Sequence, residues 1–398
     1  MERDRKFNPK NFFLTVLELV AAKERGGSTF ALGQAWNKLD LSVAKAPVKS
    51  SFSEFRCKVS SAFFKDIFID DLDRLHRHRT MLRGLFIYAV DGDELPLPAS
   101  QGVLDKGYRG RKLSGKLETH YPKMATVQAV DVVNGMVKCF EYSASAGEYT
   151  IGSKLAAQLE KNSVAIYDRL YCTYGVVTAH IEAKNFFVIR VPTAKAIQKE
   201  IADFCKSSKR SQTIDLFPPK NGTKGPAHKV RLIKIRNPRN GQDVVLMTNL
   251  KKSLFKPSEV AQLYQRRWNI ETSFRDLTST LKMTVWRGRT INSILQEIYA
   301  LFWLVNQIRC RSEALSAKNR DWLGREYFKS NFKILIQTFT EHAGLLYDGN
   351  NIAFHGIFDH WAKATRERRR HLSRSYDRVI KTHRSKYAAG SLVPRRGA

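Results

Sequence analysis

A chain of 398 residues, 43% hydrophobic and 11% aromatic, is long enough for two or three folded domains and too apolar to be disordered throughout. Its 68 lysine and arginine residues against 37 aspartate and glutamate residues leave a formal net charge of +31, which favours a polyanionic partner such as nucleic acid. The five cysteines are scattered and form no CxxC pair, which argues against a disulfide framework and against a zinc ribbon.

Residues 1–80 are predicted to be helical. Pro9 suits the first turn of a helix, and the residues after it supply an apolar face. A second periodic stretch runs from about Phe52 to Ile69. Two interpretations stay open for this region: a small helical DNA-binding domain, or a helical cap on the main domain.

Five strands are predicted next. The run LFIYAV ends in Asp91-Gly92, and Asn134-Gly135 joins two apolar runs as a hairpin. A helix from about Thr150 to Leu159 precedes a strand that ends near Asp168, and a fifth strand covers residues 185–191. This order, a hairpin followed by strands with helical crossovers, is typical of an α/β fold of the ribonuclease H-like type. Both aspartates lie at strand ends, where such sheets place their ligands.

A basic, glycine-containing segment runs from Lys106 to Lys116. It is interpreted either as a solvated surface loop or as a flap that contacts DNA phosphates. Under the second interpretation the candidate DNA-binding residues are Lys106, Arg109, Arg111 and Lys112.

The rest of the chain is predicted to hold a β-rich insertion, then a long helix that begins after Pro257, and then helical, increasingly basic segments. A run at residues 298–308 is too short to span a bilayer and is expected to be a buried helix. Five domains are expected. Residues 1–80 form a helical N-terminal DNA-binding domain, residues 81–191 the first part of the catalytic domain, and residues 192–252 the insertion. Residues 253–312 hold the catalytic helix and the end of the catalytic domain, and residues 313–398 form a helical basic C-terminal region.

The segment LYQRRWNIETSFRDLTSTLK is the most informative stretch. On a helix, Tyr264, Arg267 and Glu271 share one face because their spacings are three and four. Arginine matches a phosphate with a planar fork, and a carboxylate ligates a hard cation. A lone helical acid is more often part of an ordinary ion pair, but here the helix follows two aspartate-bearing strands. Trp268 faces elsewhere and is expected in the core.

Three motifs together resemble a known family. AVDGDELPLP, YDRLYCTY and LYQRRWNIETSFRDL are similar to motifs of the DDE transposases of bacterial insertion sequences, in the insertion-sequence-four group with the Tyr-Arg-Glu-Lys signature, over about residues 85–310. The resemblance implies a metal-binding catalytic triad of Asp91, Asp168 and Glu271. It also implies that Tyr264 and Arg267 hold the phosphates of the transposon ends.

One position departs from the family's pattern. Thr278 stands where the family has lysine, seven residues after Glu271. By helical phase, Arg275 and Lys282 lie within about 40° of the Glu271 direction, so either supplies a candidate cation. The alternative is that this copy is catalytically weak.

Other acidic residues lie near the predicted triad. Asp93 rivals Asp91, because both point to the same side of a continued strand. Asp105 and Glu148 are interpreted as structural or surface residues.

Three carboxylates with no soft ligand nearby suit Mg²⁺ or Mn²⁺. Two such ions about 4 Å apart would serve both hydrolysis and strand transfer. The resemblance further implies second-strand cleavage through a DNA hairpin, supported by an insertion that holds a flipped base. Phe186, Phe187 and Phe217 are candidate stacking partners for that base.

The expected function is a cut-and-paste transposase acting on double-stranded DNA, both terminal inverted repeats and target, as a homodimer. Cytoplasmic localisation without a membrane partner is expected, since the N-terminus lacks a signal peptide's apolar stretch. Rival interpretations are a ribonuclease H-like nuclease or resolvase, and a DNA-binding repressor derived from a transposase.

Overall fold

The computed structural model describes ten segments of the chain, and the structural statements below concern these alone. The described residues are 7–21, 28–38, 47–75, 79–110, 121–192, 197–220, 224–236, 241–316, 328–347 and 349–368.

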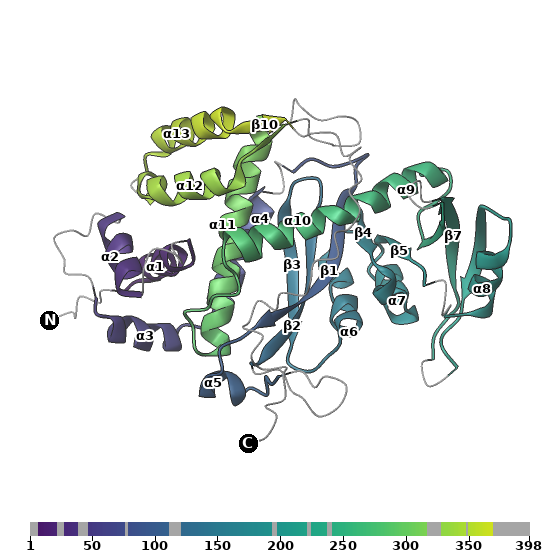
Figure 1. Cartoon of the computed structure of the whole chain (residues 1–398), viewed down its shortest axis with the longest axis horizontal. Coiled ribbons are helices and arrows are strands. Elements are labelled where there is room, and N and C mark those ends of the chain that lie inside the picture. The colour runs from purple at the N-terminus through teal and green to yellow at the C-terminus, as the bar shows by residue number, and fades with distance from the viewer. Residues whose placement is uncertain are drawn as a thin grey trace, which may run out of the picture.

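A twisted sheet forms the centre of the molecule (Figure 1). Its first five strands are β1 (Phe86–Pro96), β2 (Lys123–Asp131), β3 (Met136–Ser143), β4 (Ser163–Tyr167) and β5 (Phe186–Arg190). They lie in the order β3-β2-β1-β4-β5, with the β1–β2 and β2–β3 pairs antiparallel and the β1–β4 and β4–β5 pairs parallel. The fold is therefore α/β and ribonuclease H-like, as predicted.

β1 is longer than expected. It was expected to end at Asp91-Gly92, but it continues to Pro96 because β2 pairs with it over that whole length, from Asp131 opposite Tyr88 to Lys123 opposite Pro96. β4 pairs only with its first five residues, up to Val90. Asp91 therefore lies within β1, at the point where the neighbouring parallel strand ends.

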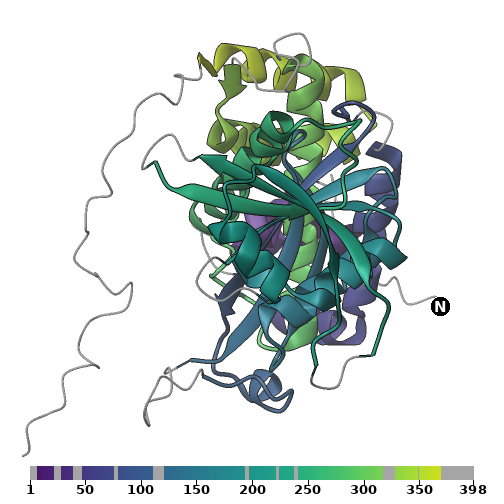
Figure 2. The same cartoon turned by 90° about the vertical axis from the view of Figure 1, so that its right-hand side faces the viewer.

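The segment after β5 extends the same sheet. It holds α8 (Lys199–Lys206), β6 (Ser211–Leu216), β7 (His228–Arg236) and β8 (Asp243–Thr248). β8 pairs antiparallel with β5, and β7 and β6 follow outward, so β1 to β8 form one continuous eight-stranded sheet. Figure 2 looks onto this end of it. The edge strand β6 was not predicted, because only two of its six side chains are buried.

Helices cover both faces of the sheet. α6 (Glu148–Ser153) and α7 (Tyr174–Glu182) lie on one face and share a core cluster with Tyr88 and Val90 of β1. α9 (Pro257–Gln265) and α10 (Asn269–Arg275) cross the other face and share a cluster with Ala89. Because side chains alternate along a strand, Asp91 faces α10 and Gly92 faces α6.

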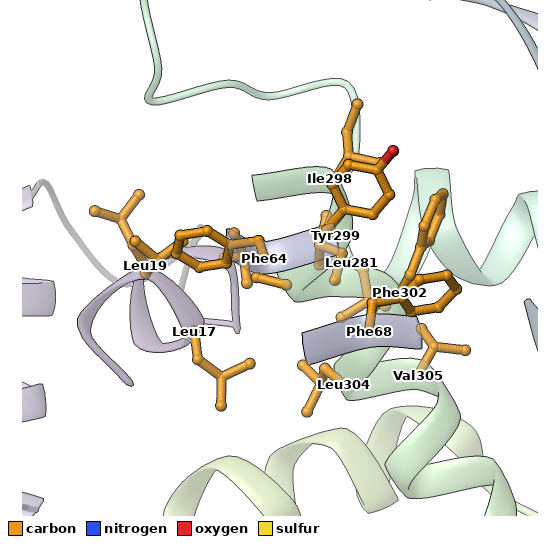
Figure 3. Close-up of a cluster of buried hydrophobic side chains, with 14 of the residues drawn as sticks. Leu17, Leu19, Phe64, Phe68, Leu281, Ile298, Tyr299, Phe302, Leu304 and Val305 are labelled. Carbon is orange, nitrogen blue, oxygen red and sulfur yellow. The ribbon is translucent and has the colours of Figure 1, made fainter. Parts of the chain in front are cut away.

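Seven further helices build a second core at the β3 end of the sheet. They are α1 (Pro9–Ala21), α2 (Ser28–Lys38), α3 (Lys49–Lys58), α4 (Ser61–Leu75), α11 (Ile291–Ser316), α12 (Phe332–Tyr347) and α13 (Asn351–Ala364). Figure 3 shows side chains of α1, α4 and α11 meeting in this cluster, together with Leu281.

The run at residues 298–308 is part of α11 and is largely buried, as expected. Its Asn306 side chain both donates to and accepts from the backbone of Val137 in β3, at 2.9 and 2.8 Å, which ties the helical core to the sheet. No helix among the described residues is long and apolar enough to cross a membrane.

Candidate active site at the end of the parallel strands

The parallel strands β1, β4 and β5 stop pairing at the same level. The last residue pairs are Val90 with Tyr167 and Tyr167 with Ile189. The residues that follow them are Asp91, Asp168 and Arg190. Since neighbouring strands lie about 4.8 Å apart, two carboxylates and a guanidinium are placed side by side at the same end of the sheet. The aspartates were predicted from the sequence; Arg190 was missed, because only the register reveals its place.

Asp91 lies in a partly desolvated position, with 26% of its side chain exposed. Burial raises its pKa above the ordinary range, and the negative charges of Asp168 and Glu271 raise it further. Arg267 and the backbone N–H of Gly92, which donates to Asp91 Oδ1 at 3.0 Å, act in the opposite direction. The three predicted carboxylates therefore share one electrostatic neighbourhood.

Asp168 is held by the turn that follows β4. Its Oδ1 accepts a hydrogen bond of 2.7 Å from the backbone N–H of Arg169 and caps a short 3₁₀ turn, Arg169–Tyr171. The Asp168 carboxylate is thus held at the carboxyl end of β4 and is half-buried.

The predicted catalytic helix is a run of helical turns rather than one regular α-helix. α9 leads through a 3₁₀ turn (Arg266–Trp268) into α10, and a π-helical turn (Asp276–Thr280) ends the run. α9 begins at Pro257, where Glu259 Oε2 accepts from the backbone N–H of Lys256 at 2.8 Å. 3₁₀ and π-helical turns within a helix often occur at functional sites.

Arg267 joins this helical run to β1. Its Nη1 lies 3.4 Å from Asp91 Oδ2, and its Nη2 lies 3.9 Å from Glu271 Oε1. Only 9% of the side chain is exposed, so the guanidinium lies buried between the two carboxylates. Tyr264 is also buried; burial raises its pKa, and it lies in the fields of Arg267, Asp168 and Arg190.

These contacts distinguish Asp91 from its rival. Asp93 Oδ1 accepts from the backbone N–H of Glu94 at 2.8 Å, and the ion pair from Arg267 goes to Asp91. Asp105 is exposed and accepts from Gln101 of the same short helix. Glu148, expected as a structural or surface residue, lies half-buried against Gly92.

The expectation for Trp268 is wrong: 48% of this residue is exposed. The 3₁₀ turn has three residues per turn, which changes the phase on which the expectation relied. The Arg267 guanidinium lies 5.0 Å from the centre of the indole ring.

The helical-phase argument for Lys282 also fails. The helical run ends at Thr280, and Lys282 has a left-handed backbone with φ of 51° beyond it. The Thr278 hydroxyl donates to the carbonyl of Phe274 at 2.7 Å, within the π-helical turn. Arg275 belongs to α10, but its side chain lies outside the described residues.

Part of the basic segment after β1 can be placed. Lys106 and Arg109 are exposed, and the Arg109 guanidinium donates to the carbonyls of Leu104 and Tyr108. Arg111 and Lys112 lie outside the described residues.

Two of the aromatics considered for a flipped base are poorly placed. Phe187 is fully buried, and Phe186 begins β5, at the opposite end of that strand from Arg190. Phe217 is 53% exposed after β6. Stacking needs an accessible ring, so Phe187 is excluded from that role.

The donor set fits a hard divalent cation. Asp91, Asp168 and Glu271 offer only oxygen ligands. Burial raises the pKa of Asp91 most, and the charges of Asp168 and Glu271 add to it; a bound cation would offset these like charges. Within the described residues, no three histidine, cysteine, aspartate or glutamate side chains converge closely enough to hold an ion. The Arg267 guanidinium instead lies between Asp91 and Glu271.

The structure thus combines a ribonuclease H-like sheet that has aspartates at adjacent strand ends with a glutamate on a helix that crosses the sheet. Residues 84–307, more than half of the chain, match the family described as Transposase DDE domain. The chain therefore belongs to the DDE transposase family, as the sequence motifs predicted.

Three curated relatives agree with this family. The chain is 28% identical over 163 residues to the y4zB protein of Sinorhizobium fredii, whose name carries the word transposase, covering 39% of this chain and 44% of that protein. It is 26% identical over 211 residues to the probable transposase for insertion sequence element IS5377 of Geobacillus stearothermophilus, covering 51% and 52%. Transposase InsG for insertion sequence element IS4 of Escherichia coli is 21% identical over 196 residues, covering 48% and 44%. The chain spans about half the length of these relatives.

Proposed function

We propose that this protein is a cut-and-paste DNA transposase that cleaves transposon ends and joins them to target DNA, with Asp91, Asp168 and Glu271 as ligands of two Mg²⁺ or Mn²⁺ ions. The observation that carries the proposal is the placement of Asp91 beside Asp168 by strand register, with Arg267 joining Asp91 to the helix of Glu271. Bound there, such ions would supply activation of a water or 3′-hydroxyl and stabilisation of the leaving oxygen.

The surrounding cations suit the DNA backbone. Arg267 has a planar guanidinium fork that matches a phosphate, and Arg190 and Tyr264 lie beside the same strand end. Filling the cation site requires Arg267 to leave its place between Asp91 and Glu271, and a DNA phosphate offers it a new partner. The exposed Lys106 and Arg109, together with Arg111, Lys112, Arg275 and Lys282, complete the proposed DNA-binding set.

Second-strand cleavage through a DNA hairpin remains part of the proposal. Extruding a base requires an accessible stacking surface, and Trp268 offers a half-exposed ring next to Arg267. Two transposon ends must be cut together, so we propose a homodimer on DNA.

The test is metal-dependent nicking of DNA that carries the inverted repeats flanking the gene. We expect Asp91→Ala, Asp168→Ala and Glu271→Ala each to abolish cleavage with Mg²⁺ or Mn²⁺ while DNA binding is largely kept. Retained cleavage in any one variant removes that residue from the proposed triad. Cutting by the unaltered protein that ignores the end sequence would point to a nuclease or resolvase instead.

One observation favours a second candidate, a DNA-binding repressor. Thr278 brings no charge to the position of the family's lysine, and its hydroxyl bonds to Phe274 within its own helical turn. Sequence-specific binding of the repeats, with no cutting under any divalent cation, would establish the repressor.

A further inference from the structure

Glu148 lies against Gly92, the residue after Asp91, on the face of β1 opposite α10. It is the first residue of α6, which packs on the face of β1 that Gly92 shares with Val90. Glu271 approaches from the other face, where Asp91 points. The two glutamates therefore flank β1 at neighbouring positions.

Gly92 makes this approach possible. A Cβ atom on residue 92 would lie 2.5 Å from Cδ and 2.8 Å from Oε2 of Glu148, closer than real Cβ contacts allow. The Glu148 carboxyl group thus occupies the space that any other side chain at position 92 would take. Gly92 lies within β1 and outside the left-handed region, so close approach, and not backbone freedom, is what requires a glycine here.

A buried hydroxyl group marks the same place independently. Tyr171 is fully buried, its ring lies against Gly152 of α6, and its hydroxyl has no hydrogen-bond partner in the described part of the chain. Burial raises the pKa of Tyr171, and the negative charges of Glu148, Asp91 and Asp168 raise it further. Leaving a buried hydroxyl without a partner is unfavourable, so we expect it to gain one when the site is filled.

We propose that Glu148 is a fourth carboxylate of the cation site, admitted across Gly92 and positioned by the Tyr171 hydroxyl. This inference rests on the proposed function. Four carboxylates carry four negative charges, which two divalent cations neutralise, and each added oxygen suits a hard cation. It also gives the glycine of the Asp91-Gly92 motif a role: it leaves room for the fourth ligand.

The experiment measures Mn²⁺ binding to the DNA-free full-length chain by calorimetry, separately from any activity. We expect Glu148→Gln to weaken Mn²⁺ binding by about 10- to 100-fold, the range found when partners around a metal site are removed. Glu141→Gln is the matched control, because Glu141 lies on β3 and accepts from Gln158 at 2.7 Å; it should bind Mn²⁺ as the unaltered chain does. Thermal unfolding without Mn²⁺ confirms that each variant is folded.

A double-mutant cycle tests the route through Gly92. The added methyl group of Gly92→Ala displaces the Glu148 carboxyl group, so it should weaken Mn²⁺ binding alone but have little further effect beside Glu148→Gln. Unchanged Mn²⁺ affinity in Glu148→Gln, with binding lost in Asp91→Asn, overturns this inference and leaves the proposed triad intact. Mn²⁺ binding that survives in Asp91→Asn overturns the proposed triad itself, and the fourth ligand with it.

Discussion

At the scale of single residues, Asp91 is where the contacts of the site meet. It accepts from the backbone of Gly92, pairs with Arg267, and feels the charges of Asp168 and Glu271. Burial and these like charges outweigh the attraction of Arg267, so the pKa of Asp91 is raised. In the metal-free fold the ionised form of Asp91 is therefore disfavoured. Its position lowers stability but suits the binding of a cation, which would favour the ionised form.

We predict that Asp91→Asn stabilises the metal-free protein while abolishing cleavage. A raised carboxyl pKa means that ionisation destabilises the fold, so stability falls as pH rises above the ordinary value of 3.8 and stays lower at neutral pH. Asparagine does not ionise, so the melting temperature of the variant should be higher at pH 7, and the difference should vanish in acid. A lower melting temperature at pH 7 would show that the Arg267 pair outweighs burial.

At the scale of elements, irregular turns set the geometry of the helical run from α9 to Thr280. The 3₁₀ turn at Arg266–Trp268 exposes the indole, and the π-helical turn at Asp276–Thr280 ends the helix before Lys282. The position of Thr278 is therefore inside the irregular turn, where it is half-buried.

We predict that Thr278→Lys tightens binding to the terminal repeats. One new phosphate contact steepens the salt dependence of binding by about one unit of logarithmic slope. The measurement is the affinity for repeat DNA over a salt series. Ser258→Lys adds the same charge at the exposed start of α9 and serves as the control. Equal gains from both variants would mean that net charge, and not position, is responsible.

A buried ionic cluster around Arg79 joins β1, β2 and the segment before β4. Arg79 is 2% exposed; it bonds to Asp131 of β2 at 2.8 Å, to Glu160 at 3.1 Å, and to the hydroxyl of Tyr88 in β1. Burial opposes the charge on Glu160, but Lys138, Tyr88 and Arg79 together lower its pKa to about 2. The lowered pKa contributes stability above pH 4.5 that is lost as pH falls through about 2.

We predict that Arg79→Ala destabilises the protein by about 3–5 kcal/mol, because it removes the cation that pairs with the buried carboxylate of Asp131. Arg83→Ala, which breaks an ion pair with Glu259 at a residue whose side chain is 44% exposed, should cost less than about 1 kcal/mol. Chemical denaturation of both variants measures the difference. Similar losses would contradict a structural role for the Arg79 cluster.

At the scale of the whole molecule, the formal charge of +31 predicts strong electrostatic binding to DNA. We expect binding of the full-length chain to repeat DNA to weaken about 10³-fold between about 50 mM and about 200 mM salt, as counterions compete for the phosphates. Titration with labelled DNA over a salt series gives the slope. A flat dependence would be inconsistent with many phosphate contacts.

Much of this protein follows from local sequence. The order of the first five strands, the hairpin at Asn134-Gly135 and the buried helix at residues 298–308 were predictable, because apolar periodicity and turn residues act over a few positions. The motifs around Asp91, Asp168 and Glu271 also predicted the family, because they are short and contiguous.

Only the tertiary structure decided the rest. Three features depend on how distant segments pair and pack. They are the pairing of β8 with β5, the strand register that places Arg190 beside Asp168, and the contact of Glu148 with Gly92. The exposure of Trp268 and the loss of phase at Lys282 depend on irregular helical turns. Strand register and helical turn type are set by packing against residues far along the chain, so local sequence patterns do not predict them.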